Sequence, residues 1–146
     1  MTGTALLDGR RRQQSAADPT RSVWVSANAG AGKTHVLVDR ALRLMLAGTR
    51  PEAILCLTFT KAAAAEMATR LERVLSEWAM AGDAALAAKL QELTGARAAK
   101  SALAPARRLF AQTLDAPGGL RIQTIHAFCQ SLLGRFPLEA AVPPHF

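Results

Sequence analysis

The stretch SVWVSANAGAGKT, residues 22–34, decides the fold that we expect for this chain. Its first part, Ser22 to Ser26, is short, β-branched and aromatic, which is typical of a buried strand. A loop of small residues follows, and from Thr34 to about Leu46 apolar side chains recur at helical spacing. The sequence therefore predicts a strand, a tight loop and a helix in direct succession.

Residues 27–34 match the phosphate-loop pattern G-x-x-x-x-G-K-[ST], except that alanine takes the first glycine position. Small residues allow backbone N–H groups to surround nucleotide phosphates, and the following helix presents its positive end to them. We expect ATP and Mg²⁺ here, with Lys33 on the β- and γ-phosphates and the Thr34 hydroxyl on the metal, as the two catalytic residues. The predicted nucleotide-binding residues of the loop are Ala27, Asn28, Ala29, Gly30, Ala31, Gly32, Lys33 and Thr34. The alternative is a glycine-rich turn that precedes a lysine by chance.

The rest of the chain continues the alternation of strands and helices. A continuous apolar run at 54–59 predicts a second strand covered on both faces, and 120–124 is interpreted as a third strand. Helical periodicity predicts helices near 67–78, 83–93, 97–114 and 125–133. The stripe of apolar residues within 67–78 indicates core rather than a cofactor site. This order implies an α/β fold with a parallel sheet flanked by helices.

No apolar strand that ends in paired acids, the usual partner of a phosphate loop in holding Mg²⁺, occurs before Phe146. We therefore expect an incomplete domain. A sheet that lacks its later strands is expected to expose an edge and apolar surface.

Charge and composition restrict the partners only broadly. The chain carries 18 Lys and Arg residues against 11 Asp and Glu residues, a net charge of +7, which favours phosphate-bearing partners. The two cysteines, Cys56 and Cys129, lack paired ligand spacing, so neither a zinc site nor a disulfide scaffold is indicated. Residues 1–21 are interpreted as a polar, solvated tail. The patterns of a signal peptide and of a membrane span are both missing, which predicts a cytoplasmic protein.

Three segments together resemble the UvrD-like (superfamily 1) DNA helicases. The first is the phosphate loop written with alanine at its first position. The second, TFTKAAAAEM at 58–67, is similar to the family's motif Ia, and the third, TIHAFC at 124–129, is similar to motif Ib. The wording of these segments is most similar to the AddA type of bacterial double-strand-break repair helicase-nuclease. A glutamine before the loop, Gln13 or its neighbour Gln14, resembles the Q-motif residue that reads the adenine edge.

The resemblance implies an incomplete first motor domain, of the P-loop NTPase (RecA-like) type, in an ATP-dependent DNA helicase. In this family, motifs Ia and Ib line a groove for single-stranded DNA, which implies DNA-binding roles for Thr58, Phe59, Thr60, Thr124 and His126. From the residues alone, Phe59 could equally be core, Thr124 an N-cap and His126 a helix-starting residue. Where the family often has an arginine after the loop threonine, this chain has His35, so Arg40 is considered as a second adenine-side contact.

The expected organisation is an N-terminal segment at 1–21 and an ATP-binding region at 22–146, with a helical insertion at about 80–116. In the complete protein, the resemblance implies binding to single-stranded and double-stranded DNA and to a partner of the AddB type. The chain alone is expected to show no DNA-stimulated ATP hydrolysis. The competing interpretations are a non-catalytic nucleotide or single-strand binding module that ends at 146, and another P-loop NTPase such as a small-molecule kinase.

Overall fold

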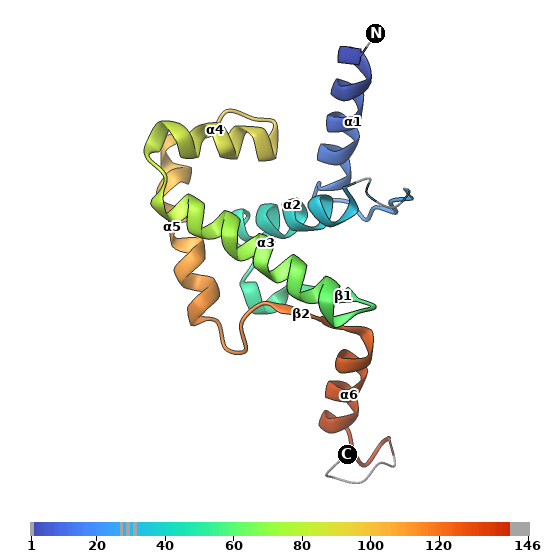
Figure 1. Cartoon of the computed structure of the whole chain (residues 1–146). Helices are drawn as coiled ribbons and strands as arrows, with labels where there is room; N and C mark the ends of the chain where they lie inside the picture. The colour runs from blue at the N-terminus through green and yellow to red at the C-terminus, as the bar shows by residue number, and fades with distance from the viewer. Residues whose placement is uncertain (1, 27, 29, 31, 141–146) are drawn as a thin grey trace.

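The computed structural model describes residues 2–140 except 27, 29 and 31, with side chains described from residue 9 onward. Its elements follow the chain in the order α1 (Thr2–Ala16), α2 (Lys33–Leu46), the short 3-10 helix η1 (Pro51–Ala53), β1 (Leu55–Thr58), α3 (Lys61–Met80), α4 (Asp83–Thr94), α5 (Lys100–Asp115), β2 (Arg121–Thr124) and α6 (Ile125–Arg135). Figure 1 shows the long α3 crossing the middle of the molecule, with α1 and α6 projecting at opposite ends.

The core forms around the apolar stripe of α3, as the sequence predicts. Met67, Leu71, Leu75 and Trp78 recur at helical spacing and are almost completely buried. They pack with apolar residues of α2, α4 and α5, including Val38, Leu42, Met45, Leu86, Leu90, Leu103 and Leu109. Because burial of apolar surface is the main driving force for folding, this four-helix contact is the principal source of stability.

Shortening a side chain at the centre of this core is expected to cost much of the stability. Leu75 is fully buried, so Leu75→Ala is expected to lower the free energy of unfolding by about 2–5 kcal/mol through the cavity it leaves. Urea unfolding followed by circular dichroism measures this change. The matched control is Leu114→Ala on α5, where the side chain is 68% exposed and the expected change is below about 0.5 kcal/mol. Equal losses in the two variants would contradict this assignment of the core.

The sheet of the described residues has two strands, β1 and β2, which pair in parallel. Their register joins Leu55 to Arg121 and Thr58 to Thr124, so both strands end at the same level. Side chains alternate between the two faces of a strand, and Cys56 packs against the core on the α3 side. Leu55 and Leu57 point away from it and are 42% and 41% exposed. The prediction that this strand is covered on both faces is therefore wrong, because α3 covers one face and the other is open.

Residues 22–26 do not form the predicted buried strand. They have no regular secondary structure, and Trp24 is 93% exposed. An extended segment becomes a strand only where a neighbour pairs with its backbone, and in the described part of the chain the two strands pair with each other. The expectation of exposed apolar surface at the sheet is confirmed by this segment together with Leu55 and Leu57.

The interpretation of residues 1–21 as a solvated tail is also wrong, because Thr2–Ala16 forms helix α1. This segment is rich in alanine, leucine, glutamine and arginine, which favour helices, and it contains no proline before Pro19. Ala17, directly after the helix, is completely buried. The helix therefore docks on the rest of the molecule at its C-terminal end.

The remaining helices lie close to their predicted positions. The largest difference is that α3 begins at Lys61 rather than near 67, because the Thr60 hydroxyl caps it by accepting a hydrogen bond from the Ala63 backbone N–H at 3.1 Å. The insertion between the strands consists of α4 and α5, joined to α3 and to β2 by glycine-containing turns. The predicted helical insertion at about 80–116 thus matches the observed helices.

Candidate functional site

The backbone of the phosphate loop is shaped by two glycines. Gly30 and Gly32 have φ angles of 79° and 81°, in the left-handed region that other residues adopt at a cost. Asn28 is exposed at the beginning of the described part of the loop. The predicted binding residues Ala27, Ala29 and Ala31 lie outside the described residues. The two glycines thus bring the chain from the exposed 22–26 segment to the start of α2.

The N-terminus of α2 is the positive end of the loop. Gly32 is its N-cap, no side chain caps it, and its first turn contains no acidic residue. The backbone N–H groups of such a turn suit an anion such as a phosphate. The Lys33 ammonium donates a hydrogen bond to the Asn28 carbonyl at 2.8 Å, so the lysine side chain folds back across the loop. Thr34 follows Lys33 in this first turn and is half-buried.

The structure distinguishes between the two glutamines of the Q-motif-like segment. The Gln13 amide nitrogen lies 3.1 Å from the position that a Cβ atom would take on Gly32, so it stands directly beside the phosphate loop. The Gln14 amide instead donates a hydrogen bond to the Glu92 carbonyl of α4 at 3.2 Å. Gln13 is therefore the glutamine that lies at the predicted nucleotide site.

Arg40 holds the chain between α1 and the loop. Its guanidinium donates hydrogen bonds to the carbonyls of Ala16, Asp18 and Arg21, at 3.4, 2.5 and 2.6 Å. These contacts fix the residues that follow α1 against α2. The structure gives Arg40 this structural function, and its predicted contact with adenine stays a prediction.

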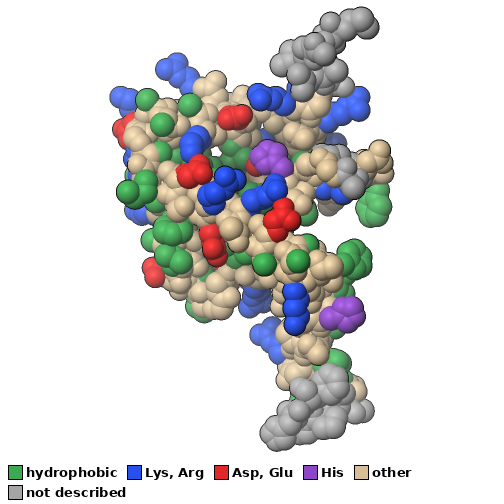
Figure 2. All heavy atoms as spheres, in the orientation of Figure 1, with side chains coloured by type: hydrophobic (Ala, Val, Ile, Leu, Met, Phe, Trp, Pro, Cys, Tyr) green, Lys and Arg blue, Asp and Glu red, His purple; other side chains and the backbone are tan. Residues whose placement is uncertain are grey.

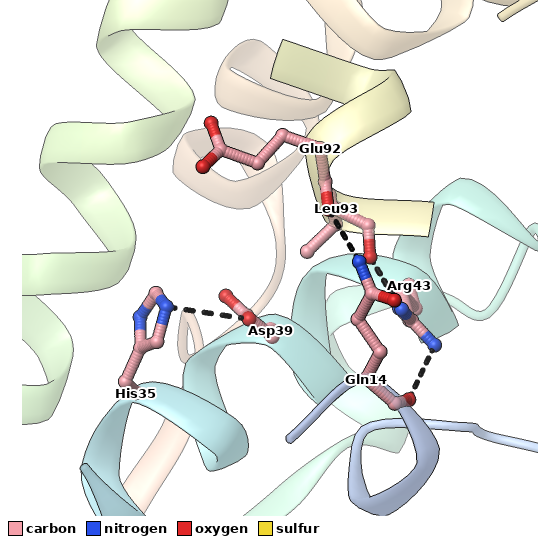
Figure 3. A network of polar contacts seen from close by, with 6 residues as sticks. All are labelled: Gln14, His35, Asp39, Arg43, Glu92 and Leu93. Atoms are coloured by element: carbon pink, nitrogen blue, oxygen red, sulfur yellow. Dashed lines mark hydrogen bonds and ion pairs between the residues drawn. The ribbon is translucent and has the colours of Figure 1, made fainter. Parts of the chain in front are cut away.

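His35, at the position after Thr34, is paired within α2. Its imidazole Nε2 lies 3.5 Å from the Asp39 carboxylate one turn further along the helix, as Figure 3 shows. Burial raises the pKa of the Asp39 carboxyl above its usual value, and the nearby His35 and Arg43 oppose this shift. Asp39 thus ties His35 to the wall of the neighbouring cleft.

A cleft of about 990 Å³ opens beside the start of α2, between α1, α3 and α4. This volume lies within the range of small-molecule sites, roughly 300–1,000 Å³. Its lining includes Gln13 and His35 and the charged residues Arg10, Asp39, Arg70, Arg73, Glu77, Lys89 and Glu92. Figure 2 shows basic, acidic and histidine side chains gathered on this face. One pair crosses the cleft wall, because the Lys89 ammonium contacts the Glu77 carboxylate at 2.6 Å. Gln13 thus joins the phosphate loop to a polar cleft.

The residues predicted to contact DNA gather where β1 and β2 end. Thr58 pairs in register with Thr124, so the motif Ia-like and motif Ib-like segments lie side by side despite their separation in sequence. Phe59 follows Thr58 and is 86% exposed, which excludes the alternative that it belongs to the core. His126, in the first turn of α6, is also exposed.

The threonines at these strand ends organise the helices that follow. The Thr60 and Thr124 hydroxyls accept hydrogen bonds from the Ala63 and Ala127 backbone N–H groups, each at 3.1 Å. The interpretation of Thr124 as an N-cap is confirmed, and its side chain is buried. The Thr58 hydroxyl donates to the Thr60 carbonyl at 3.0 Å and stabilises the turn between β1 and α3. This turn presents the Phe59 ring to solvent.

Sequence reasoning missed one set of residues near the site. Arg43, on the same helix as Lys33, donates hydrogen bonds to the carbonyls of Gln14 and Leu93, which belong to α1 and α4. The sequence holds one indication of it, since Arg40 and Arg43 are spaced three residues apart and so project from neighbouring positions of α2. The partners of these arginines could not be found without the docking of α1 and α4.

Two further observations concern the described ranges alone. No three His, Cys, Asp or Glu side chains there form a group that could hold a metal ion. In the same ranges, no helix combines the length and the apolar character needed to cross a lipid bilayer.

Comparison with known proteins agrees with the arrangement of the strand ends and the phosphate loop. Residues 9–146 match the UvrD/REP helicase N-terminal domain. The chain is 34% identical over 137 residues to the A subunit of the ATP-dependent helicase/nuclease of Lactobacillus acidophilus, covering 94% of this chain and 10% of that protein. It is 32% identical over 135 residues to the protein of the same name from Lactiplantibacillus plantarum, covering 92% and 10%. The corresponding protein of Desulforamulus reducens is 35% identical over 139 residues, covering 92% and 9%.

The chain thus spans about a tenth of the length of these relatives. No solved structure matches it significantly. The family match covers the phosphate loop, both strands and all helices from α2 onward. The chain therefore belongs to the UvrD/REP helicase family, whose N-terminal domain it matches.

Proposed function

We propose that this chain is the ATP-binding first part of an ATP-dependent DNA helicase that acts in double-strand-break repair and recombination. The observation that carries the proposal is the parallel pairing of β1 with β2, which brings Thr58 and Phe59 beside Thr124. A single strand of DNA crossing these strand ends would contact both helicase-like segments at once. The relatives, each named as one subunit of a helicase/nuclease, support this proposal and suggest a partner of the AddB type.

The proposed nucleotide site lies at the start of α2. The first-turn N–H groups would receive the phosphates of ATP, and the Lys33 ammonium would exchange the Asn28 carbonyl for the β- and γ-phosphates. The Thr34 hydroxyl would be a ligand of Mg²⁺, while Gln13 would receive the base. ATP bound with Mg²⁺ supplies the free energy for movement along DNA. The positive helix end, the two left-handed glycines and the hydroxyl at Thr34 all fit such a ligand.

The proposed fold of the complete domain is the P-loop NTPase type with a larger parallel sheet. Residues 22–26 would supply a strand to it, because Val23, Trp24 and Val25 form the β-branched and aromatic segment that such a strand requires. The open face of β1, with Leu55 and Leu57, would be covered in the same domain.

The proposed DNA contacts are independent of base sequence. The exposed Phe59 ring offers a face for base stacking, and His126 lies near it at the start of α6. Thr58, Thr60 and Thr124 would position the DNA backbone mainly by shaping the two turns, because their hydroxyls bond to the protein backbone.

The proposal is tested by measuring two ligands on the purified chain. We expect ATP to bind more tightly with Mg²⁺ than in the presence of EDTA, by titration calorimetry. We also expect a fluorescent oligo-dT to bind, with an affinity that falls about tenfold between about 50 and about 200 mM salt, because released counterions accompany phosphate contacts. ATP binding without any oligo-dT binding at low salt would contradict the helicase assignment and favour another kind of P-loop NTPase.

A further inference from the structure

The C-terminal ends of two helices meet on Arg43 of α2. Its guanidinium donates to the Gln14 carbonyl in the last turn of α1 at 3.0 Å, and its Nε donates to the Leu93 carbonyl in the last turn of α4 at 3.0 Å. A second nitrogen, Nη2, also donates to Leu93. Carbonyls at a helix C-terminus lack partners within the helix and carry partial negative charge, so a cation there stabilises both ends. Arg43 thus joins α1, α2 and α4.

Gln14 completes the joint from the other side. Its amide nitrogen donates to the Glu92 carbonyl at 3.2 Å, one residue before the carbonyl that Arg43 holds. Its amide oxygen lies 3.5 Å from the position that a Cβ atom would take on Gly95, the left-handed residue that ends α4. Figure 3 shows Gln14 and Arg43 side by side, both reaching the end of α4. The insertion helix α4 is therefore the support on which the end of α1 rests.

The position of Gln13 depends on this support. Gln13 is adjacent to Gln14 in the last turn of α1, and its amide lies beside Gly32 of the phosphate loop. A helix turn is rigid, so holding the backbone and side chain of Gln14 fixes the direction in which Gln13 points. Arg43 makes these contacts far along α2 from Lys33, and so it acts on the site through Gln13.

We infer that Arg43 is a positioning residue for recognition of the nucleotide base, acting through the end of α1 and supported by α4. The inference rests on the proposed function, in which Gln13 receives the base. An amide that both donates and accepts matches the N6 donor and N7 acceptor of adenine, but only if it is held in one place. Loss of Arg43 would let α1 shift relative to the phosphate loop, so discrimination between bases falls while binding of the phosphates persists.

The test compares the affinity for ATP with the affinity for GTP. In Arg43→Gln, the ratio of the two is expected to fall by about tenfold, which corresponds to loss of one well-aligned hydrogen bond. The matched control is Arg107→Gln, because Arg107 likewise clamps α4, through the Ala81 carbonyl at 2.9 Å and Asp83 at 2.6 Å, but at the opposite end of that helix. A merely structural arginine lowers stability without changing the ratio, so Arg107→Gln is expected to keep the wild-type ratio.

A second arm asks whether Arg43 acts through Gln13. If it does, Arg43→Gln adds no further loss of the ratio in a Gln13→Ala background, as a double-mutant cycle detects. Arg43→Lys, which retains the charge but not the planar fork, is expected to give an intermediate ratio and replaces Arg43→Gln should that variant unfold. A wild-type ratio in both Arg43 variants, or full additivity with Gln13→Ala, overturns the inference. Wild-type protein that binds no ATP would instead overturn the proposed nucleotide site.

Discussion

Lys33→Ala is expected to weaken ATP binding by about a hundredfold, corresponding to roughly 3 kcal/mol for hydrogen bonds between an ammonium and phosphates. In the structure the Lys33 ammonium lies over the loop, on the Asn28 carbonyl at 2.8 Å, from which it can transfer to a phosphate. Titration calorimetry with ATP and Mg²⁺ measures the change. Stability is expected to change little, because the lysine side chain is exposed and its bond to Asn28 is local.

The control for this variant is Lys100→Ala. Lys100 is the first residue of α5, as Lys33 is the first residue of α2, and both are exposed. The substitution thus removes the same charge from the same position of a helix away from the phosphate loop. ATP affinity is expected to stay near the wild-type value in Lys100→Ala. Equal weakening in both variants would mean that ATP responds to net charge rather than to a built site.

Phe59→Ala is expected to have the second largest effect, a loss of single-stranded DNA affinity by about 5- to 150-fold, since one base stacked on an aromatic ring is worth ~1–3 kcal/mol. Phe59 is 86% exposed at the end of β1, beside the paired Thr58 and Thr124. Its removal leaves no cavity, so the free energy of unfolding is expected to stay the same. Fluorescence anisotropy with oligo-dT measures the affinity.

Met80→Ala is the matched control for the aromatic ring. Met80 is 88% exposed at the last residue of α3, whereas Phe59 precedes the first turn of the same helix. Both substitutions remove a large exposed apolar side chain, but only one is at the strand ends. An undiminished DNA affinity in Phe59→Ala, or an equal loss in Met80→Ala, would remove the strand ends from the proposed DNA groove.

Local patterns in the sequence account for most of the helices and for two of the three predicted strands. The stripe from Met67 to Trp78 requires a buried helix face whatever surrounds it, and this prediction is confirmed. The threonines that follow β1 and β2 set the starts of α3 and α6 by hydrogen bonds within three residues. Such local interactions depend on neighbours in sequence, so a linear pattern is enough to predict them.

Predictions that depended on distant partners were the ones that differed. The segment 22–26 has the composition of a strand, but pairing needs a neighbouring backbone, and none of the described strands lies against it. Residues 2–16 have helix-forming composition, yet the basic run Arg10 to Arg12 suggested a tail. Only docking through Gln14, Arg40 and Arg43 shows that this helix belongs to the folded body.

By itself, the sequence determined the family, the phosphate-loop residues and the order of the elements, because these are encoded in short motifs and in periodicity. Tertiary structure decided which glutamine lies at the loop, that Phe59 is exposed, and that Thr58 stands beside Thr124. It also revealed that Arg43 ties the end of α4 to the end of α1. The physical reason is that these contacts join residues dozens of positions apart, whose distances are set by packing of the helices and not by spacing along the chain.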